Sequence, residues 1–382
     1  MKLNAQFSIF DQNIVLTDDE DEKLKKTKQE LQDNLDEYSK RVNTDFDKLI
    51  IGNFVQGSYQ RKTCLKQQEG KLPDIDIVVI TKMDEGEFDP AKLAQEKFIP
   101  FVEEYYSGKY EQQGRSIGVK LDDVGVDLDI VITSNPKESE TGFLTESLFK
   151  NMGNSKDWNL EDLEKAMSGI SRLTRLDKSE SIFNESIQLS EVAKNVDPLR
   201  IPDRDADKWQ NTNPMAQIVW AVKKNKVCKN KYLPLVRSLK WMRNSFGNFP
   251  KYPKGYPLEH IIGDNCPNDF SSIAEGIVIT LSNIINSYKS HYEEGTIPYL
   301  RDRGVDENVL SRQTVDDFRS FYKRIIEAHD LAQRAILNDD SHESSKLWRE
   351  LLGEEFPLIE PEGDKWTKPD SASEPEKPRR FA

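Results

Sequence analysis

The apolar positions of the N-terminal segment follow a helical spacing before any strand pattern begins. Leucine, tyrosine and valine recur at intervals of three, four and seven between positions 17 and 43. This spacing predicts one long amphipathic helix, long enough to brace two lobes. Thr17 and Glu20 form a capping box at its start, and acidic residues fill its first turn.

Runs rich in β-branched residues follow this helix, and we interpret them as strands. They lie at positions 50–56, 74–81 and 126–133. The pair Asp89-Pro90 has the character of an N-cap followed by a first helical residue, so a second helix is predicted to begin there. The first half of the chain is therefore expected to be α+β or α/β.

The second half of the chain has a different pattern. Periodicity is weak from 134 to 212, where we expect an elaborated connection over a cleft with short helical stretches at 160–168 and 182–194. Beyond it the spacing is helical throughout, which predicts an all-helical region. The predicted helices are 216–226, 233–245, 257–263, 271–292, 314–337 and 342–352.

Composition narrows the class of protein. The 382 residues are 36% hydrophobic and carry 54 Lys and Arg against 67 Asp and Glu, a net charge of −13. This balance opposes attraction to polyanions, so a DNA or RNA template is disfavoured. No run approaches the roughly 20 apolar residues of a membrane-spanning helix, and no signal-peptide pattern is visible. We therefore expect a cytoplasmic protein without a membrane partner.

The cysteines and histidines provide no metal or disulfide pattern. Cys64, Cys228 and Cys266 lie far apart in the sequence, and the four histidines are scattered. No Cys-x-x-Cys or Cys-His pairing supplies the ligands of a tetrahedral zinc site. Neither a disulfide framework nor structural zinc is expected.

Acidic residues in two of the predicted strands indicate phosphate chemistry. Asp74 and Asp76 alternate with apolar residues, so their carboxylates project to one face, about 6.6 Å apart along the strand. Asp129 lies on a later strand, and neighbouring strands are about 4.8 Å apart. Three converging carboxylates repel one another unless Mg²⁺ or Mn²⁺ ions neutralise them, and a pair of such ions promotes in-line phosphoryl displacement. The pattern predicts nucleotidyl transfer.

The dipeptide Gly57-Ser58 distinguishes this pattern from an exposed Asp-x-Asp strand edge, which is the commoner structural role of two such aspartates. It lies between the strand that ends at Gln56 and the aspartate-bearing strand. Glycine lets backbone amides approach a triphosphate closely, and the serine adds a hydroxyl donor. Asp127 is an alternative third carboxylate on the same strand face, but we favour Asp129 because an apolar run follows it.

Three of these segments resemble the nucleotidyltransferase core of polymerase-β-type enzymes. They read GSYQRKT, PDIDIVVIT and VDLDIVIT. More narrowly, they resemble the cGAS/DncV-like nucleotidyltransferases (CD-NTases) of bacterial CBASS anti-phage signalling. Later segments resemble clade D of that family in order and spacing: RIPDRDADKW, NPMAQIVWAVKKNK, YPKGYPLEHIIG, SSKLWRELLG and RRFA. The resemblance covers essentially the whole chain.

The resemblance implies an α+β fold with two lobes and a tail. A polymerase-β-like nucleotidyltransferase lobe with a mixed β-sheet and the long N-terminal helix would span residues 1–205. An all-helical lobe of the oligoadenylate-synthase type would span 206–359. Residues 360–382, rich in Pro, charge and small polar side chains, are expected to be disordered. The implied reaction is template-independent condensation of ATP and GTP into a cyclic oligonucleotide, with cyclic AMP-AMP-GMP as the clade's precedent.

Residue by residue, the resemblance assigns the metal site and the phosphate-gripping turn. Asp74, Asp76 and Asp129 match the metal-binding acids, with two Mg²⁺ ions as the implied cofactor. Gly57 and Ser58 match the turn that grips the phosphates.

Further nucleotide contacts are implied around this turn and in the helical lobe. Lys240 falls where the family holds phosphates with a lysine, although without the surrounding motif it would be interpreted as part of a solvated helix face. Tyr256 falls where an aromatic ring stacks on a base. Gly255 departs from relatives that often have serine there, so a side-chain phosphate contact is lost. The contacts expected near the turn are Arg61 and Thr63, with Gln56 as a weaker candidate, although Arg61 could equally be an exposed arginine without a ligand.

Three other side chains are weaker candidates for the nucleotide site. Arg115 could reach the cleft, and Arg204 and Trp209, in the segment that joins the lobes, could shape a base pocket. For Trp209 we favour a packed core role without a ligand, and Arg115 is more simply interpreted as an arginine that does not contact the nucleotide.

The clade also implies partners. Its operons commonly pair the synthase with an E1–E2 ubiquitin-transfer-like protein that joins the C-terminal carboxylate to a target. The tail ends in Arg-Arg-Phe-Ala, which suits conjugation through Ala382, although an ordinary frayed terminus is the alternative. A downstream effector is expected to read the product. The zinc insertion with which animal cGAS grips DNA is missing, so activation by double-stranded DNA is not expected.

Two rival functions remain compatible with the sequence. A nucleotidyltransferase of this kind could instead modify RNA ends or a protein, and an inactive scaffold could act through its tail. The intact aspartates argue against the scaffold, and the acidic net charge argues against RNA.

Overall fold

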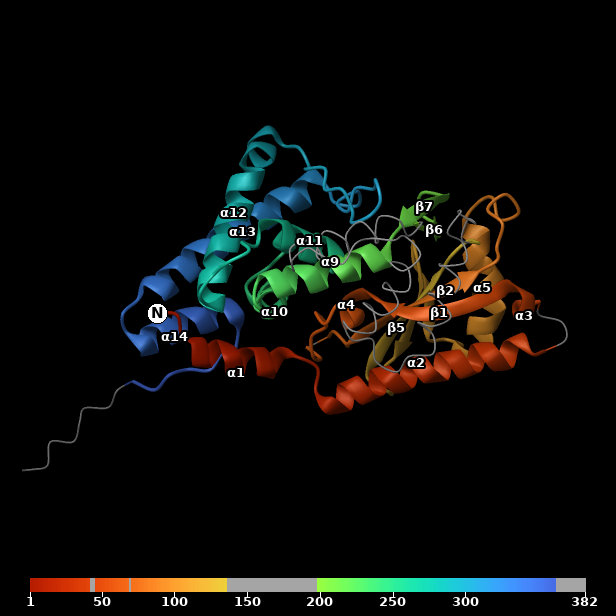
Figure 1. The fold of residues 1–382 in the computed structure, drawn as a ribbon, viewed down its shortest axis with the longest axis horizontal. Coiled ribbons are helices and arrows are strands. Elements are labelled where there is room, and N and C mark those ends of the chain that lie inside the picture. The colour runs from red at the N-terminus through yellow and green to blue at the C-terminus, as the bar shows by residue number, and fades with distance from the viewer. Residues whose placement is uncertain (42–44, 69, 136–197, 362–382) are drawn as a thin grey trace, which may run out of the picture.

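The structure is a computed structural model that describes residues 1–41, 45–68, 70–135 and 198–361. A mixed sheet with its helices forms one lobe, and a group of helices forms the other beside it (Figure 1). In chain order the elements are α1 (Asn4–Ile14), α2 (Asp18–Ser39), α3 (Phe46–Leu49), β1 (Ile50–Gln56), α4 (Gly57–Gln60), β2 (Asp74–Thr81), α5 (Lys92–Tyr106), β3 (Tyr110–Gln112), β4 (Ile117–Leu121), β5 (Val126–Ile132), β6 (Leu199–Asp203), β7 (Lys208–Thr212), α9 (Pro214–Val227), α10 (Tyr232–Ser245), α11 (Tyr256–Asn265), α12 (Ile273–Glu294), α13 (Val315–Leu337) and α14 (Ser341–Leu352).

Five strands form the sheet, in the order β1-β2-β5-β4-β3. β2 and β5 run parallel, and the other neighbouring pairs are antiparallel, so the sheet is mixed. The predicted strands at 50–56 and 74–81 are confirmed, and the third is confirmed except that it ends at Ile132. The sequence pattern does not reveal β3 and β4, because they are only 3 and 5 residues long.

Alternation along β2 divides its side chains between the two faces of the sheet. Ile75, Ile77 and Val79 pack with α2 and α5 in one hydrophobic cluster. Val78 and Ile80 pack on the opposite face with residues of β6 and α9 in another. Even-numbered positions of β2 therefore face away from α2 and α5, and the strand's two aspartates belong to this series.

The N-terminal region contains two helices. α2 carries the predicted capping box, in which the Thr17 hydroxyl accepts from the Glu20 amide, and it ends at Ser39 rather than at position 43. Its buried leucines belong to the cluster under the sheet. The sequence pattern did not predict α1, whose Phe7 and Phe10 pack with Trp348 in the helical lobe. The chain therefore begins in the second lobe, although the predicted boundary assigns residues 1–205 to the first.

The prediction that Asp89 is an N-cap is wrong. α5 begins at Lys92, and its cap position is Ala91. The amides of Leu93 and Ala94 donate to the carbonyls of Pro90 and Ala91. These i to i+3 bonds are those of a tighter turn, which comes between the proline and the first α-helical residue.

The predicted helices of the second half are confirmed as α9 to α14, each within two residues at either end. The segment predicted as a connection contains a hairpin of β6 and β7 where it is described. The helical stretches predicted at 160–168 and 182–194, and the tail from 362, lie outside the described residues.

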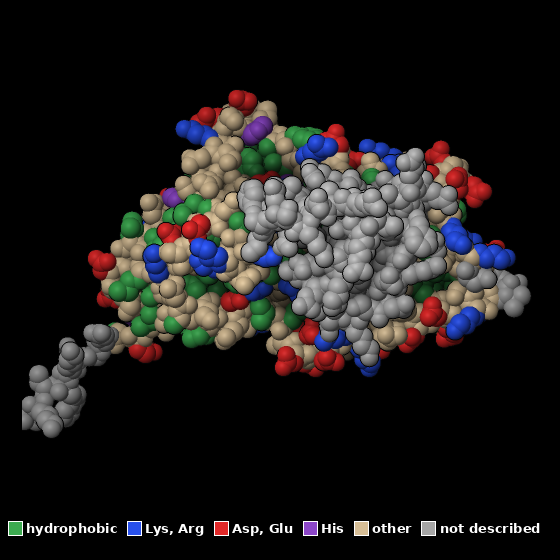
Figure 2. Space-filling view, viewed as in Figure 1, with side chains coloured by type: hydrophobic (Ala, Val, Ile, Leu, Met, Phe, Trp, Pro, Cys, Tyr) green, Lys and Arg blue, Asp and Glu red, His purple; other side chains and the backbone are tan. Residues whose placement is uncertain are grey.

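Within the described chain, no helix combines the length and apolar character needed to cross a membrane. Acidic and basic side chains are intermingled over the described part of the face in Figure 2. Cys64, Cys228 and Cys266 are buried free thiols.

Candidate active site

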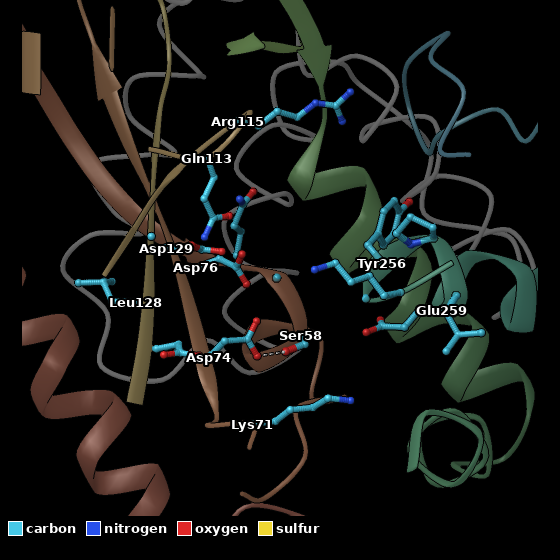
Figure 3. A pocket seen from close by; sticks show the side chains of 18 of the residues that line it. Ser58, Lys71, Asp74, Asp76, Gln113, Arg115, Leu128, Asp129, Tyr256 and Glu259 are labelled. Carbon is cyan, nitrogen blue, oxygen red and sulfur yellow. Dashed lines mark hydrogen bonds between the residues drawn. The ribbon is translucent and has the colours of Figure 1, made fainter. Parts of the chain in front are cut away.

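The parallel pairing of β2 with β5 brings the acidic residues together. Its register sets Asp76 opposite Asp129 and Asp74 opposite Asp127. All of them lie on the face that is turned away from α2 and α5, because strand side chains alternate. Figure 3 shows Asp76 beside Asp129, with Asp74 further along the same strand. The predicted convergence of the carboxylates is thus present in the fold.

The electrostatics at this point disfavour ionised carboxylates. The pKa of Asp76 is raised well above its ordinary value, first by burial and then by repulsion from Asp74 and Asp129. Arg61 and Lys240 lower it, but by less. A nearby cation would relieve the cost of keeping this carboxylate ionised.

Asp129 has the same character. Burial, followed by repulsion from Asp74 and Asp127, raises the pKa of Asp129 to about 6. Lys254 and a hydrogen bond from Ser116 act in the opposite direction. A carboxyl group with a pKa this close to neutrality is suited to accept a proton during a reaction.

The donor set fits a divalent cation. Carboxylate oxygens are the ligands that Mg²⁺ prefers, and the repulsion between these side chains is what a cation would neutralise. Among the described residues, no three acidic, histidine or cysteine side chains already meet as a metal-binding group. Asp74, Asp76 and Asp129 are the residues that would hold an ion here, after their side chains adjust.

The predicted turn lies directly against these acids. Gly57 begins α4 with a φ of +72°, a conformation that favours glycine. The Ser58 hydroxyl donates to Oδ1 of Asp74 at 3.4 Å, as drawn in Figure 3. The strand β1 that leads into the turn pairs Gln56 with Asp76. The turn and the acids therefore form one continuous surface.

The opposite wall centres on Glu259 of α11, a residue that no sequence motif indicated. Its carboxylate accepts from Arg61 Nε at 2.9 Å, Thr63 Oγ1 at 2.9 Å and Lys240 Nζ at 2.8 Å. An acid within the apolar run Tyr-Pro-Leu-Glu-His-Ile-Ile was the available signal. Burial opposes ionisation, but Arg61 and Lys240 outweigh it and lower the pKa of Glu259 to about 2.

Tyr256 lies one turn before this glutamate. The Arg61 guanidinium lies 4.9 Å from the centre of its ring, and its hydroxyl donates to Asp302 at 2.6 Å. Gly255 caps α11 with a φ of +55° and has nothing within 4 Å of the position a Cβ would take. The space that a serine side chain would occupy is therefore open.

These walls enclose a cleft of about 950 Å³ between the lobes. Several basic residues outside the predicted site also line it, among them Lys71, Arg243 and Lys254. The predicted site residues that line the cleft are Gln56, Gly57, Ser58, Arg61, Asp74, Asp76, Asp129, Lys240 and Tyr256.

The prediction that Thr63 contacts the nucleotide is corrected by its position in the fold. It is 1% exposed and is not among the residues that line the cleft. Its hydroxyl donates to Glu259, which makes it part of the wall rather than a surface that meets a nucleotide. Ala382 lies outside the described residues.

Of the three weaker candidates for the nucleotide site, one lines the cleft and two do not. Arg115 lines the cleft and donates through Nε to Asp203 at 2.9 Å. Arg204 is exposed and Trp209 packs against the cluster under the sheet, and neither lines the cleft. The packed role that we favoured for Trp209 is the one the fold shows.

A mixed sheet with two aspartates on one strand, a third on its parallel neighbour and a glycine-serine turn against them defines a polymerase-β-like nucleotidyltransferase. A family model described as the Second Messenger Oligonucleotide or Dinucleotide Synthetase domain matches residues 1–141. The chain is 37% identical to a cyclic AMP-AMP-GMP synthase of Enterobacter hormaechei, over 100% of both chains. It belongs to the CD-NTase family of cyclic oligonucleotide synthases and is a nucleotidyltransferase.

Two further similarities extend this assignment. A cyclic AMP-AMP-AMP synthase of Acinetobacter is 26% identical, over 83% of this chain and 76% of the relative. The structure of the CD-NTase CdnG of Bradyrhizobium diazoefficiens in complex with GTP has a TM-score of 0.59 and 13% identity, and the match covers 91% of this chain and 94% of that one. The latter similarity shows the fold, and the narrower resemblance to clade D stays a prediction.

Proposed function

We propose that this chain condenses ATP and GTP into cyclic AMP-AMP-GMP, a second messenger for anti-phage signalling in the cytoplasm. The observation that carries the proposal is the register that sets Asp76 opposite Asp129, with Gly57 against Asp76. Full-length similarity to a cyclic AMP-AMP-GMP synthase supports the choice of product. A net charge of −13 supports synthesis without a nucleic-acid template.

Each step of the proposed reaction forms one phosphodiester bond. A ribose hydroxyl of the acceptor nucleotide attacks the α-phosphorus of the donor triphosphate, and the bond from that phosphorus to the bridging oxygen of the β-phosphate breaks. Pyrophosphate leaves with the electron pair. Asp129 takes the hydroxyl proton, a role supported by the raised pKa of its carboxyl group.

Side chains on both walls position the donor nucleotide for this attack. Ser58 and the backbone of the turn hold its phosphates from one side, and Lys240 holds them from the other. The Tyr256 ring stacks on a base. Asp74, Asp76 and Asp129 would hold two Mg²⁺ ions, or Mn²⁺ in their place, which would supply positive charge to offset the negative charge that develops in the reaction.

The test is replacement of both β2 aspartates, Asp74→Asn with Asp76→Asn. Purified protein is incubated with labelled ATP, GTP and Mg²⁺, and the product is analysed by resistance to phosphatase and by mass. The double variant should form no more than a trace of the wild-type product. Its melting temperature in metal-free buffer should equal or exceed that of wild type, because the mutual repulsion raising the pKa of Asp76 is removed.

The same assay separates the rival functions. A phosphatase-sensitive linear product, or label transferred to RNA or to the protein, would replace cyclic synthesis with end modification. No nucleotide incorporation by wild type would favour the scaffold. Product formation by the double variant at more than a trace would contradict the metal assignment.

A second part of the proposal concerns partners. We propose that an E1–E2 protein conjugates the chain through the carboxylate of Ala382 and that a downstream effector reads the product. Deletion of Phe381 and Ala382 should leave synthesis unchanged and abolish the covalent adduct in cells that co-express the E1–E2 protein. Mass spectrometry of the tail peptide is the measurement. An adduct on the truncated chain would contradict this proposal.

A further inference from the structure

Glu259 is the most completely enclosed acidic side chain of the cleft wall. It is 4% exposed, and its Oε1 accepts from both Thr63 Oγ1 and Lys240 Nζ, while Oε2 accepts from Arg61 Nε. The partners come from separate parts of the fold, since Arg61 and Thr63 follow α4 of the sheet lobe and Lys240 lies on α10. One carboxylate thus ties the phosphate-gripping turn to two helices of the second lobe.

The charges at this point are unequal. Two cations, Arg61 and Lys240, face one anion, so the group carries a surplus of one positive charge. Both cations also act on Asp76, whose pKa they lower. A surplus cation that is held in a cleft wall beside the acidic site is suited to bind an anionic group of the substrate.

Donor counting shows which group is available to a ligand. An ammonium group has three N–H donors. Lys240 directs one to the Thr63 carbonyl at 2.9 Å and one to Glu259 at 2.8 Å. Lys240 also lines the cleft. Its third donor is therefore available to a ligand there, and the first two set the position of the nitrogen.

Glu259 itself has no group available to bind a phosphate. Both of its oxygens already accept hydrogen bonds from buried groups, and a carboxylate would repel phosphate. The Arg61 guanidinium that it holds also lies 4.9 Å from the centre of the Tyr256 ring. Figure 3 shows Glu259 and Tyr256 on the wall opposite the aspartates.

We propose that Glu259 is a positioning residue that fixes Lys240 and Arg61 so that Lys240 meets the β- and γ-phosphates of the bound nucleotide. The inference rests on the proposed function, because it assigns the polyphosphate of the substrate to this wall. It predicts that Glu259 matters for nucleotides with a polyphosphate chain and not for those without one.

The experiment measures binding rather than turnover. Glu259→Gln keeps the size of the side chain but removes the charge that holds the two cations. Calorimetry with α,β-methylene-ATP and Mg²⁺ should show at least tenfold weaker binding than wild type, whereas AMP binding should change less than twofold. Equal weakening for both ligands, or none for either, would reduce Glu259 to a purely structural role.

Asp11→Asn is the matched control. Asp11 of α1 accepts from Arg237 of α10 at 2.8 and 2.7 Å, so this pair also ties α10 to another element and lies one turn from Lys240. It does not line the cleft. The variant should lower the melting temperature without changing the affinity for α,β-methylene-ATP. A tenfold loss in this control would show that any loosening of α10 suffices, and would overturn the proposal.

A double-variant series tests whether Glu259 acts through Lys240. Lys240→Met alone and Lys240→Met with Glu259→Gln should bind α,β-methylene-ATP equally weakly, because Glu259 acts on the phosphates through Lys240. A double variant that binds α,β-methylene-ATP more weakly than Lys240→Met alone would contradict the proposal. If Glu259→Gln does not fold, Arg61→Met with Glu259→Met removes both charges at once; it should still show the tenfold loss, and wild-type affinity would overturn the inference.

Failure of this inference and failure of the proposed function give different results. Wild-type protein that binds α,β-methylene-ATP but makes no cyclic product would contradict the function alone. Normal cyclic synthesis together with unchanged nucleotide affinity in Glu259→Gln would contradict the positioning role alone.

Discussion

A Cβ atom placed on Gly57 would lie 1.7 Å from Oδ2 of Asp76. The glycine has a φ of +72°, so the backbone conformation and the carboxylate both require a residue without a side chain. The turn that is proposed to hold phosphates can approach the acid closely for this reason. The proposed phosphate site and the proposed metal site are therefore parts of one piece of structure.

Gly57→Ala should lower the rate of cyclic product formation by about a hundredfold or more, because Asp76 must move to admit the methyl group and misplacement of about 1 Å costs that much. The measurement is the initial rate at saturating ATP and GTP. Gly125→Ala is the control, since Gly125 has a φ of +82° but nothing within 4 Å of the added atom. A rate loss of the same size in the control would attribute the effect to backbone strain alone.

Asp129 and Asp127 share a strand face, and the register separates their roles. Asp129 lies opposite Asp76 and Asp127 lies opposite Asp74. We expect Asp129→Asn to abolish synthesis, because it removes the proposed base and ion ligand, and Asp127→Asn to retain at least a third of the wild-type rate. The measurement is cyclic product per enzyme at neutral pH. Abolished synthesis in Asp127→Asn with activity retained in Asp129→Asn would reverse the assignment.

Stability of the metal-free protein should depend on the proton of Asp129. Its folded pKa is about 6, against about 3.9 for an unfolded aspartate. The folded state binds this proton more tightly, so the stabilisation is complete below about pH 4 and is lost as pH rises through about 6. In EDTA, Asp129→Asn should therefore gain in melting temperature relative to wild type between pH 5 and pH 7.

The stabilisation of wild-type protein by added Mg²⁺ should increase with pH, whereas the stability of the metal-free protein decreases with pH. Carboxylate ligands must be ionised to bind a cation, so the rise in melting temperature caused by Mg²⁺ should be small at pH 5 and larger at pH 7. Thermal melts with and without Mg²⁺ at both pH values provide the test. Equal stabilisation at pH 5 and pH 7 would show that this carboxyl group does not bind the ion.

The Tyr256 ring and its hydroxyl can be tested separately. Tyr256→Leu removes the stacking surface, which contributes about 1–3 kcal/mol per base, and should raise KM for the affected nucleotide by roughly five-fold to a hundredfold. Tyr256→Phe removes only the hydrogen bond to Asp302 and should change KM less than threefold. KM for ATP and GTP measured separately also shows which base the ring contacts. An unchanged KM in Tyr256→Leu would exclude stacking.

Local chemistry made much of the sheet lobe predictable. The alternation of Asp74, Ile75, Asp76 and Ile77 already fixes which residues share a face, because the period of a strand is two wherever the strand lies. The capping box of α2 and the helices of the second half could be predicted for the same reason, since helical spacing and caps involve residues only a few positions apart. The family resemblance added the order of lobes and the identity of the reaction.

The wall of the cleft was not predictable in this way. Arg61 and Thr63 follow the turn at Gly57 and Ser58, so sequence position alone suggested that both contact the triphosphate. The fold directs both to Glu259, which is 196 residues from Thr63 in the chain. Arg61 still lines the cleft, whereas Thr63 does not. Which partner satisfies a buried charge depends on what the rest of the chain brings within hydrogen-bonding distance, and no local pattern encodes that distance.

The sequence by itself determined the strand that carries Asp74 and Asp76, the turn at Gly57 and the helical character of the second lobe. Tertiary structure alone decided the parallel register of β5 on β2, which sets Asp129 opposite Asp76, and the packing of α1 in the helical lobe. The first group follows from the backbone geometry of neighbouring residues. The second requires segments far apart in the chain to find one another, and that choice is made by the burial of whole faces.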